Sequence, residues 1–193
     1  MRKVFMINRI SVDGFYASNN QAMQGMDWFI HDPLVDAAIH KPINADTLVL
    51  GHSTFRLFES SWVPVLTDPN ANPIMKGIAE ELTRMRKLVF SRSTQVSDWD
   101  NTEFCSEDPQ AVISRMRHSD GPDLLILGSG SIVRILASSQ GIDEYIFIVS
   151  PTISGSGKPL FPGLGRCDLD LVSSQGFDSG NVVLHYKLRA NKG

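Results

Sequence analysis

Short apolar runs recur along this chain, and segments with helical periodicity separate many of them. The runs bounded by glycine, serine or charged residues predict buried strands over 4–10, 47–50, 88–90, 124–127 and 145–149. The clearest helix is predicted over 73–86, where Ile74, Ile78, Leu82 and Met85 form one apolar stripe. Strands therefore alternate with helices through most of the chain.

Capping signals place further helices. Asp32-Pro33 and Asp108-Pro109 each pair a capping side chain with a proline suited to the first helical position. A helix is also predicted over 131–138, directly after a glycine turn. The segment 65–73 is rich in proline and asparagine and is predicted to be a surface loop.

The last part of the chain changes from alternation to consecutive strands. Leu169–Ser174 and Val182–Leu188 predict an antiparallel pair around the turn Ser179-Gly180-Asn181. Alternating elements followed by strands favour a three-layer α/β fold with a mixed, mostly parallel central sheet flanked by helices. We expect residues 1–193 to form one domain.

Composition narrows the classes of function. The chain has 193 residues, is 42% hydrophobic and carries a formal net charge of −3 without a basic block, which disfavours nucleic acid as a partner. No apolar run reaches transmembrane length, and we expect a cytoplasmic protein without membrane association. Cys105 and Cys167 lack metal-like neighbours, so we expect free thiols and no metal site.

The most informative motif is Gly128-Ser129-Gly130-Ser131, between a predicted strand and a predicted helix. The start of a helix offers unpaired N–H groups and a partial positive charge, and glycine lets a phosphate approach them. Such turns also occur for purely structural reasons. A Rossmann fingerprint would need glycine where Val133 stands, and a P-loop would need a lysine, so neither family fits.

Two other predicted strands end in a similar way, at Gly51-His52-Ser53-Thr54 and Ser91-Arg92-Ser93. In α/β sheets, ligands bind beyond the carboxyl ends of parallel strands. Three polar ends side by side would form one anion-binding edge, which suits a dinucleotide with several phosphates.

The chain resembles a known family over nearly its whole length. The resemblance rests on motifs in the right order: Ile10-Ser11-Val12-Asp13-Gly14-Phe15-Tyr16-Ala17, Leu50 to Phe55, Lys87 to Arg92, Leu127 to Ser131, Gly141 to Glu144 and Pro151 to Phe161. It is similar to the dihydrofolate reductase superfamily. Within it, the chain most resembles the reductase domain of bifunctional riboflavin-biosynthesis deaminase–reductases (RibD C-terminal domain) in a stand-alone form.

The resemblance implies a dihydrofolate reductase-like fold and a reductase that uses NADPH, with NADH as the alternative, on a small planar heterocycle, as in the riboflavin-pathway pyrimidine reductases. It implies that Gly128, Ser129, Gly130, Ser131 and Ile132 hold the diphosphate and that Gly51, His52, Ser53 and Thr54 bind phosphates from the other side. It places Ser91, Arg92 and Ser93 around the 2′-phosphate, and Asp13 and Gly14 beside the nicotinamide.

The chain departs from the family pattern at His52, where arginine is usual, so Arg92 carries more of the selectivity for the 2′-phosphate. The zinc deaminase motif is absent, so the chain is at most the reductase half. By resemblance, Asp36 is the candidate proton donor and substrate contact, with Asp27 and Asp32 as competitors. A solvated helix face is the alternative for Asp36.

Phe15 and Trp28 are candidates for stacking on the substrate, with core packing as the alternative. Folate reduction and non-enzymatic dinucleotide binding remain rival functions. Riboflavin-type reductases commonly pair through their C-terminal strands. We therefore expect a homodimer that covers the apolar runs 145–149 and 182–186, unless one domain buries both by itself.

Overall fold

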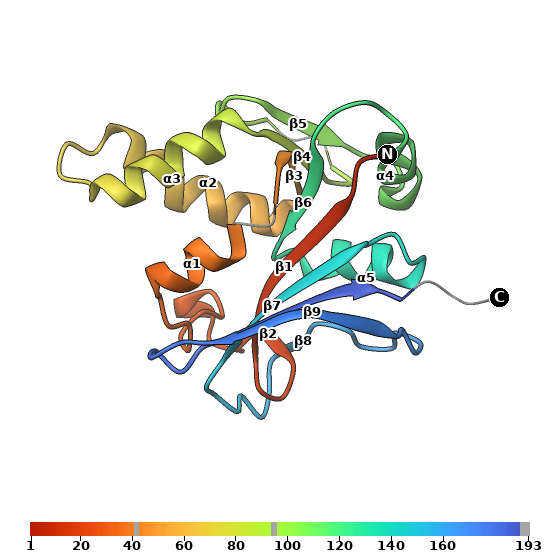
Figure 1. Cartoon of the computed structure of the whole chain (residues 1–193). Coiled ribbons are helices and arrows are strands. Elements are labelled where there is room, and N and C mark those ends of the chain that lie inside the picture. Colours follow the sequence, from red (N-terminus) through yellow and green to blue (C-terminus); the bar gives the residue numbers. More distant parts are fainter. Residues whose placement is uncertain (41–42, 94–95, 190–193) are drawn as a thin grey trace.

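The computed structural model describes residues 1–40, 43–93 and 96–189, and its centre is one mixed sheet (Figure 1). The strands of this eight-stranded sheet lie in the order β5-β4-β3-β6-β1-β7-β10-β9. Their bounds are β1 Val4–Ser11, β3 Ala45–Gly51, β4 Arg86–Phe90, β5 Thr102–Cys105, β6 Asp123–Leu127, β7 Glu144–Ser150, β9 Leu169–Gly176 and β10 Val182–Leu188. All neighbouring pairs from β5 to β7 are parallel, and β10 is antiparallel to both β7 and β9. The predicted fold class is confirmed.

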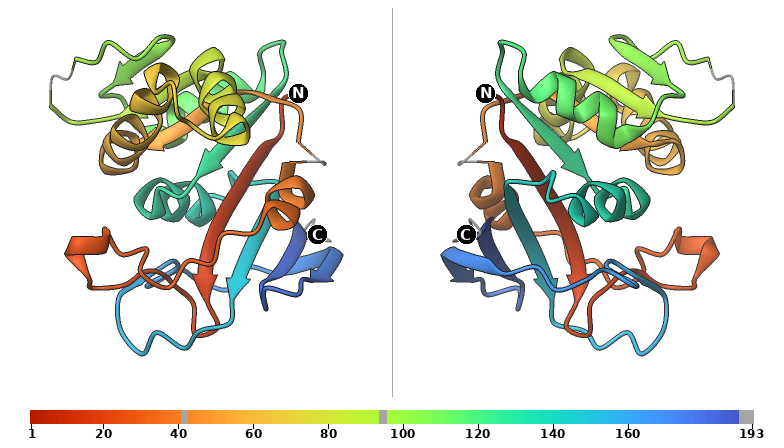
Figure 2. Two further views of the ribbon diagram at one scale, coloured as in Figure 1. Left: turned by 90° about the vertical axis from the view of Figure 1, so that its left-hand side faces the viewer. Right: turned by 90° about the vertical axis from the view of Figure 1, so that its right-hand side faces the viewer.

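Alternation along the central strands gives the sheet two buried faces. On β1, Phe5 and Ile7 join a core with Phe55 of α2, whereas Val4 and Met6 join the other core with Val133 of α5. Figure 2 shows helices on both sides of the sheet. Helices α1 (Pro33–His40), α2 (His52–Thr67) and α3 (Pro73–Arg84) pack on the first face, and α4 (Pro109–Arg117) and α5 (Gly130–Ser138) on the second. A three-layer arrangement results.

A second, two-stranded sheet lies beyond the carboxyl end of β1. It pairs β2 (Phe15–Ala17) with β8 (Lys158–Pro159) in antiparallel fashion. A 3-10 turn, η1 (Gln21–Met23), follows β2. This small sheet places the segments that flank β2 and β8 near the edge of the central sheet where the predicted site lies.

The structure corrects several predicted boundaries. The predicted surface loop 65–73 is wrong at its start, because α2 continues through Pro64 to Thr67. The predicted helix 73–86 ends at Arg84, since Arg86 already begins β4. Helix α2 and the edge strand β5 had not been predicted. Among the described residues, no helix is long and apolar enough to cross a membrane.

The two apolar runs that suggested a dimer are largely covered within this chain. Tyr145 to Ile148 on β7 are each at most 9% exposed. On β10, Val183 and His185 are buried, while Leu184 and Tyr186 are partly buried. For β7, the structure therefore shows the second alternative, in which a single chain buries the apolar run by itself. Among the described strands of the sheet, the exposed large apolar side chains lie instead on β9, where Leu171 is 57% and Val172 is 50% exposed.

Candidate active site

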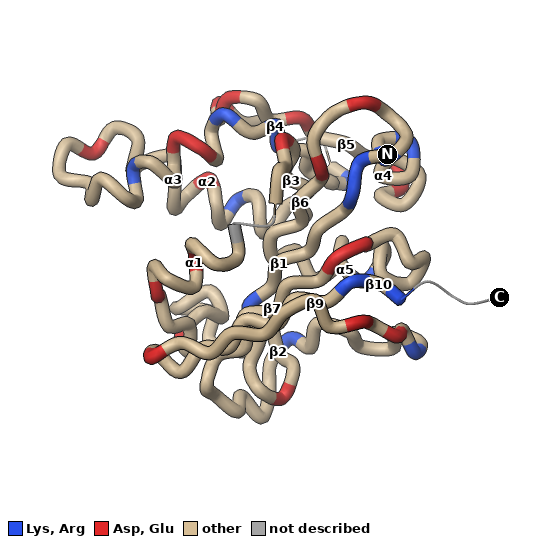
Figure 3. The backbone as a smooth tube through the Cα atoms, viewed as in Figure 1, with Lys and Arg blue, Asp and Glu red and all other residues tan. Residues whose placement is uncertain are grey.

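The three polar strand ends meet at one edge of the sheet. Strands β4, β3 and β6 are consecutive neighbours and run parallel, so Ser91–Ser93, Gly51–Thr54 and Gly128–Ile132 follow their carboxyl ends side by side. We call these three segments the polar edge. Figure 3 shows Lys and Arg dispersed among Asp and Glu over the whole backbone, so an anion site on this molecule has to be local.

Hydrogen bonds between segments hold the polar edge together. The Gly51 N–H donates to Ser129 Oγ at 2.9 Å, and the Ser129 N–H donates to Thr54 Oγ1 at 3.2 Å. Asn8 Nδ2 on β1 donates to the Gly128 carbonyl at 3.0 Å. Ser129 is only 4% exposed. The Ser129 and Thr54 hydroxyls therefore join loops to each other, and the exposed hydroxyls are those of Ser53 and Ser131.

The helices that begin at this edge lack side-chain caps. Neither α2, with Gly51 at its N-cap, nor α5, with Ser129 there, has a capping hydrogen bond or an acidic residue in its first turn. By contrast, Asp32, Asn72 and Asp108 cap α1, α3 and α4. Uncapped helix starts leave N–H donors for an external partner and favour negative charge. Both uncapped starts lie at the polar edge.

The backbone of the glycine turn is left-handed, with φ of +61° at Gly128 and +53° at Ser129. A non-glycine residue held in this region stores strain of the kind found at functional sites. Gly130 has a different reason for being glycine. A Cβ there would lie 2.6 Å from ring atoms of Tyr16, so the protein's own aromatic ring is packed on the first turn of α5. We had expected this glycine to give room to a phosphate.

The end of β4 supplies an exposed cation. Arg92 is exposed, and Ser91 Oγ donates to the Ser93 carbonyl at 3.1 Å. His52 accepts a hydrogen bond from Arg56 Nε at 3.3 Å, and Arg56 Nη1 also pairs with Glu59 at 2.6 Å. Sequence reasoning missed Arg56. Its position four residues after His52 would have revealed it, had α2 been predicted as a helix.

Asp13 lies at the turn after β1, and its carboxylate is engaged by the protein. It accepts hydrogen bonds from Ser11 Oγ at 2.6 Å, Ser154 N at 2.9 Å and Gly155 N at 2.7 Å. These donors lower the pKa of the Asp13 carboxyl to about 2. Asp13 thus ties the segment after β7 to β1. Gly14 follows with a φ of +85°, and its carbonyl accepts from Leu160 N.

The candidate substrate residues divide into two groups. Asp36 lies on α1, and its carboxylate is 3.4 Å from His31 Nδ1. Trp28 packs edge-on against Phe29, with ring centroids 4.8 Å apart, and its buried indole N–H has no hydrogen-bond partner among the described residues. Phe15 is on β2 instead, where it pairs with Pro159. Asp32, a competitor of Asp36, caps α1 and accepts from Ser179 Oγ, so it has a structural task.

One residue of this region escaped the sequence analysis altogether. Arg9 lies near the carboxyl end of β1, and its guanidinium carbon is 5.4 Å from the Phe29 ring centroid. An arginine in an otherwise apolar strand is the signal that could have revealed it. Arg9 therefore belongs to the region that holds Trp28, Phe29 and α1.

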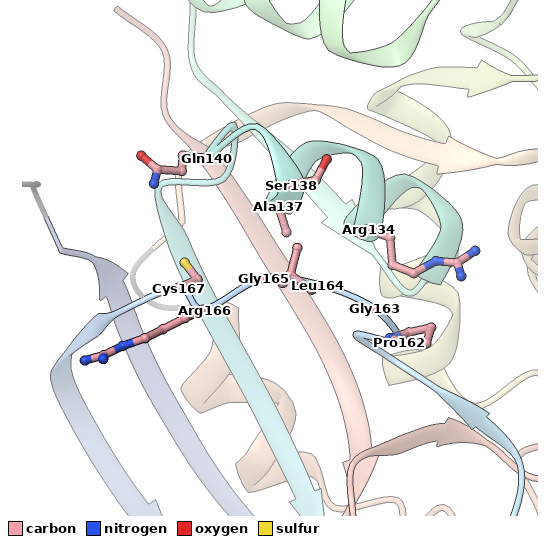
Figure 4. Close-up of a pocket in the computed structure, with 10 residues that line it drawn as sticks. All are labelled: Arg134, Ala137, Ser138, Gln140, Pro162, Gly163, Leu164, Gly165, Arg166 and Cys167. Carbon is pink, nitrogen blue, oxygen red and sulfur yellow. The ribbon is translucent and has the colours of Figure 1, made fainter.

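A pocket of about 240 Å³ lies away from the polar edge. It is formed by the flank of α5 and the segment 162–167 (Figure 4). Arg134 and Pro162 lie at one side of it, and Gln140 and Cys167 at the other. Because the uncapped helix starts and the exposed Arg92 lie elsewhere, we place the candidate active site at the polar edge and not in this pocket.

Comparisons with known proteins agree with this architecture. The family model of the RibD C-terminal domain matches residues 2–183. Among relatives, the Bacillus subtilis uncharacterized protein YyaP is 26% identical over 96% of this chain and 94% of its own length. The Bacillus subtilis uncharacterized protein YwjB is 27% identical over 96% and 97%.

Solved structures share the fold. A putative riboflavin biosynthesis protein from Shewanella sp. PV-4 aligns with a TM-score of 0.70 and 17% identity over 97% of this chain and 99% of that one. A pyrimidine reductase-like protein from Corynebacterium diphtheriae gives 0.65, with 14% identity over 98% and 93%. A Thermotoga maritima deaminase and 5-amino-6-(5-phosphoribosylamino)uracil reductase gives 0.66, with 15% identity over 97% of this chain and 57% of that longer chain.

Proposed function

Since this chain belongs to the RibD C-terminal domain family, we propose that it is an NAD(P)H-dependent reductase that transfers hydride to a small planar heterocycle. Its solved neighbours include proteins described as riboflavin-biosynthesis and pyrimidine-reductase-like. Reduction of a riboflavin-type pyrimidine is therefore the first activity to test.

One observation carries the proposal: two uncapped helix starts, tied to each other through Gly51 and Ser129, lie at neighbouring strand ends. Their free N–H groups and partial charges suit a diphosphate. We assign the diphosphate to Gly128–Ile132 and to Gly51–Thr54. Exposed Ser53 and Ser131 are the hydroxyls that can reach it.

The residues present fit a reduced nicotinamide dinucleotide, which would supply the hydride. Hydride transfer asks the protein mainly to hold donor and acceptor in line. Asp36 is the candidate for protonating the substrate, and its neighbour His31 would orient that carboxylate. Trp28 is the candidate for stacking, with Phe29 supporting its ring.

Cofactor binding is the direct test. We expect NADPH to bind at micromolar concentration, measured by the change in its own fluorescence or in that of tryptophan. Failure of both NADPH and NADH to bind at millimolar concentration would contradict the proposal.

The preference for NADPH is expected to depend on Arg92. Replacing Arg92 with alanine should weaken NADPH binding by about 1.5–3 kcal/mol, the range for hydrogen bonds to charged groups, and leave NADH unchanged. Arg166→Ala is the matched control, because Arg166 lies in the segment beside the pocket of Figure 4. An equal loss for both cofactors would show that Arg92 does not contact the 2′-phosphate.

Folate reduction is the second candidate, and Asp36 on the first helix favours it, since an acid there could hydrogen-bond a pterin. Oxidation of NADPH in the presence of dihydrofolate decides between the two reductions. Tight cofactor binding without turnover on a flavin precursor, pterin or quinone would instead identify a non-enzymatic dinucleotide-binding protein.

A further inference from the structure

Hydrogen bonds and an aromatic contact fix the Arg9 side chain on the face of the sheet that α1 covers. Its side chain follows Phe5 and Ile7 on β1, whose side chains lie in the same core as Val35 and Ile39 of α1. Nη1 of Arg9 donates to Asn181 Oδ1 at 2.9 Å and to Ser150 Oγ at 3.5 Å. The Phe29 ring lies against the guanidinium at 5.4 Å.

The groups that hold Arg9 are themselves fixed. Asn181 and Ser150 are both fully buried. Asn181 Nδ2 donates to Ser179 Oγ at 3.0 Å and to the Ile30 carbonyl at 3.3 Å, and Ser179 Oγ donates to Asp32 Oδ2 at 2.5 Å. This network connects β1, the β9–β10 turn and the start of α1. It fixes one edge of the guanidinium, and no described residue engages the other edge.

The Arg9 charge has no carboxylate partner in the part of the chain that the structure describes. No acid lies within 4.0 Å of it, and its Nε and Nη2 donate no hydrogen bond to those residues. Burial lowers the pKa of the guanidinium, and Asp36 and Asp32 oppose this only at a distance. Both acids have other partners, His31 and Ser179. A half-buried arginine stays charged, so an unpaired edge is costly unless a ligand completes it.

This unpaired edge lies close to the polar edge. The preceding residue of β1, Asn8, donates to the Gly128 carbonyl. Strand β1 is the immediate neighbour of β6, which carries the glycine turn, and is two strands from β3. Neighbouring strands are about 4.8 Å apart, so Arg9 is displaced sideways by about 10 Å from the start of α2. A ring seated beside Arg9 would therefore be next to a cofactor bound at the polar edge.

We propose that Arg9 is a substrate-recognition residue whose free guanidinium edge binds carbonyl or anionic oxygens of a planar heterocyclic dione seated between β1 and α1. The proposal rests on the proposed reductase function and assigns to it a residue that determines substrate specificity. A planar fork of donors matches a ring oxygen together with an adjacent ring nitrogen that accepts or is deprotonated. A ring that presents amino groups there would place donor against donor and is rejected. Phe29 and Trp28 supply the aromatic surroundings.

Two pteridines of equal size test this preference. Lumazine carries oxygens at positions 2 and 4, and 2,4-diaminopteridine carries amino groups at the same positions. We expect the wild-type protein with NADP⁺ to bind lumazine at least about tenfold more tightly than the diamine, measured by calorimetry. Arg9→Met should weaken lumazine by at least about tenfold and narrow the difference between the two ligands.

Arg9→Lys keeps the charge and loses the fork, so an intermediate affinity is expected. This variant also reports on the site if the methionine variant does not fold, which thermal melting will show. Arg166→Met is the matched control, because the Arg166 side chain is 85% exposed and outside this network. Its lumazine affinity should equal that of the wild type.

The failures of this inference and of the proposed function are distinguishable. NADPH bound normally with lumazine affinity unchanged in both Arg9 variants, or with no preference for lumazine in the wild type, would overturn the role of Arg9 alone. Lumazine binding that depends on Arg9 in a protein that binds neither NADPH nor NADH would support the Arg9 site and overturn the reductase.

Discussion

Tyr16 and Gly130 show how a single contact can change the meaning of a motif. The sequence pattern suggested that Gly130 admits a phosphate, whereas the structure places the Tyr16 ring there. More than half of the chain separates Tyr16 from Gly130, so no local pattern could reveal their contact. A dinucleotide that uses the N–H groups of this turn has to fit beside the tyrosine ring or displace it.

Replacing Gly130 with alanine should therefore destabilise the protein. The added Cβ would overlap the ring at 2.6 Å, and we expect the free energy of unfolding to fall by about 1–3 kcal/mol. Tyr16→Ala in the same chain should relieve most of this loss, as a double-mutant cycle by urea unfolding would show. Gly77→Ala is the control: it has open space in exposed α3 and should stabilise by about 0.5–1 kcal/mol. Additive effects at 16 and 130 would contradict the contact.

Asp13 predicts a specific acid sensitivity. Its folded pKa of about 2 lies below the ordinary value of 3.8, so the unfolded state binds the proton more readily. The stabilisation is present above pH 4 and is lost as the pH falls toward 2. Unfolding of the wild type and of Asp13→Asn should differ by a constant amount above pH 4 and converge at lower pH. A difference in the free energy of unfolding that does not change with pH over this range would show that the ionised Asp13 carboxylate does not stabilise the protein through Ser154 and Gly155.

At the scale of elements, the starts of α2 and α5 lack the acidic residue that would suit their free N–H groups. Ser131→Asp would supply one in the exposed first turn of α5. We expect it to stabilise the protein by about 0.3–1 kcal/mol and to weaken NADPH binding by at least about fivefold. Gln110→Asp adds the same charge to α4, which Asp108 already caps, and should not affect NADPH. An NADPH affinity that is unchanged in Ser131→Asp would show that the diphosphate does not bind at the start of α5.

The elements that sequence reasoning found carry strong local signals, and those it missed do not. Each central strand contains a continuous apolar run, and Asp32 and Asp108 were correctly predicted as caps. Helix α2 was missed because His52-Ser53-Thr54 resembles the end of a strand and Pro64 resembles the start of a loop. Strand β5 is a short edge strand without a buried run. The meeting of the three polar ends was predictable from strand direction, but Arg9 gained its environment only from tertiary contacts.

At the scale of the whole molecule, the large apolar side chains that are exposed on strands of the described sheet lie on β9 and not on β7. Leu171 and Val172 lie on this edge strand beside a bulge opposite His185 and Tyr186. An unpaired edge with exposed apolar side chains is a site for pairing with another chain. We expect a homodimer through β9, with light scattering giving about twice the chain mass of 21.3 kDa.

Leu171→Glu should convert this dimer to a monomer. It should leave NADPH affinity unchanged, since β9 is at the other end of the strand order from β4 and β3. Val12→Glu offers a matched control, because Val12 is also exposed, at 62%, but lies outside β9. A wild-type protein with the mass of one chain would reject the dimer.

The place of β6 in the sheet has a consequence for how the molecule is made. β6 lies between β3 and β1, although both precede it in the chain. During synthesis, β1 and β3 therefore emerge before β6, the strand that joins them, so β1 has no neighbour and one edge of β3 is unpaired. Closure of such distant pairings is slow and leaves edges exposed to other chains. A nascent chain that stops before Asp123 should aggregate or engage chaperones, and cofactor can be captured only after ribosomes have passed the glycine turn.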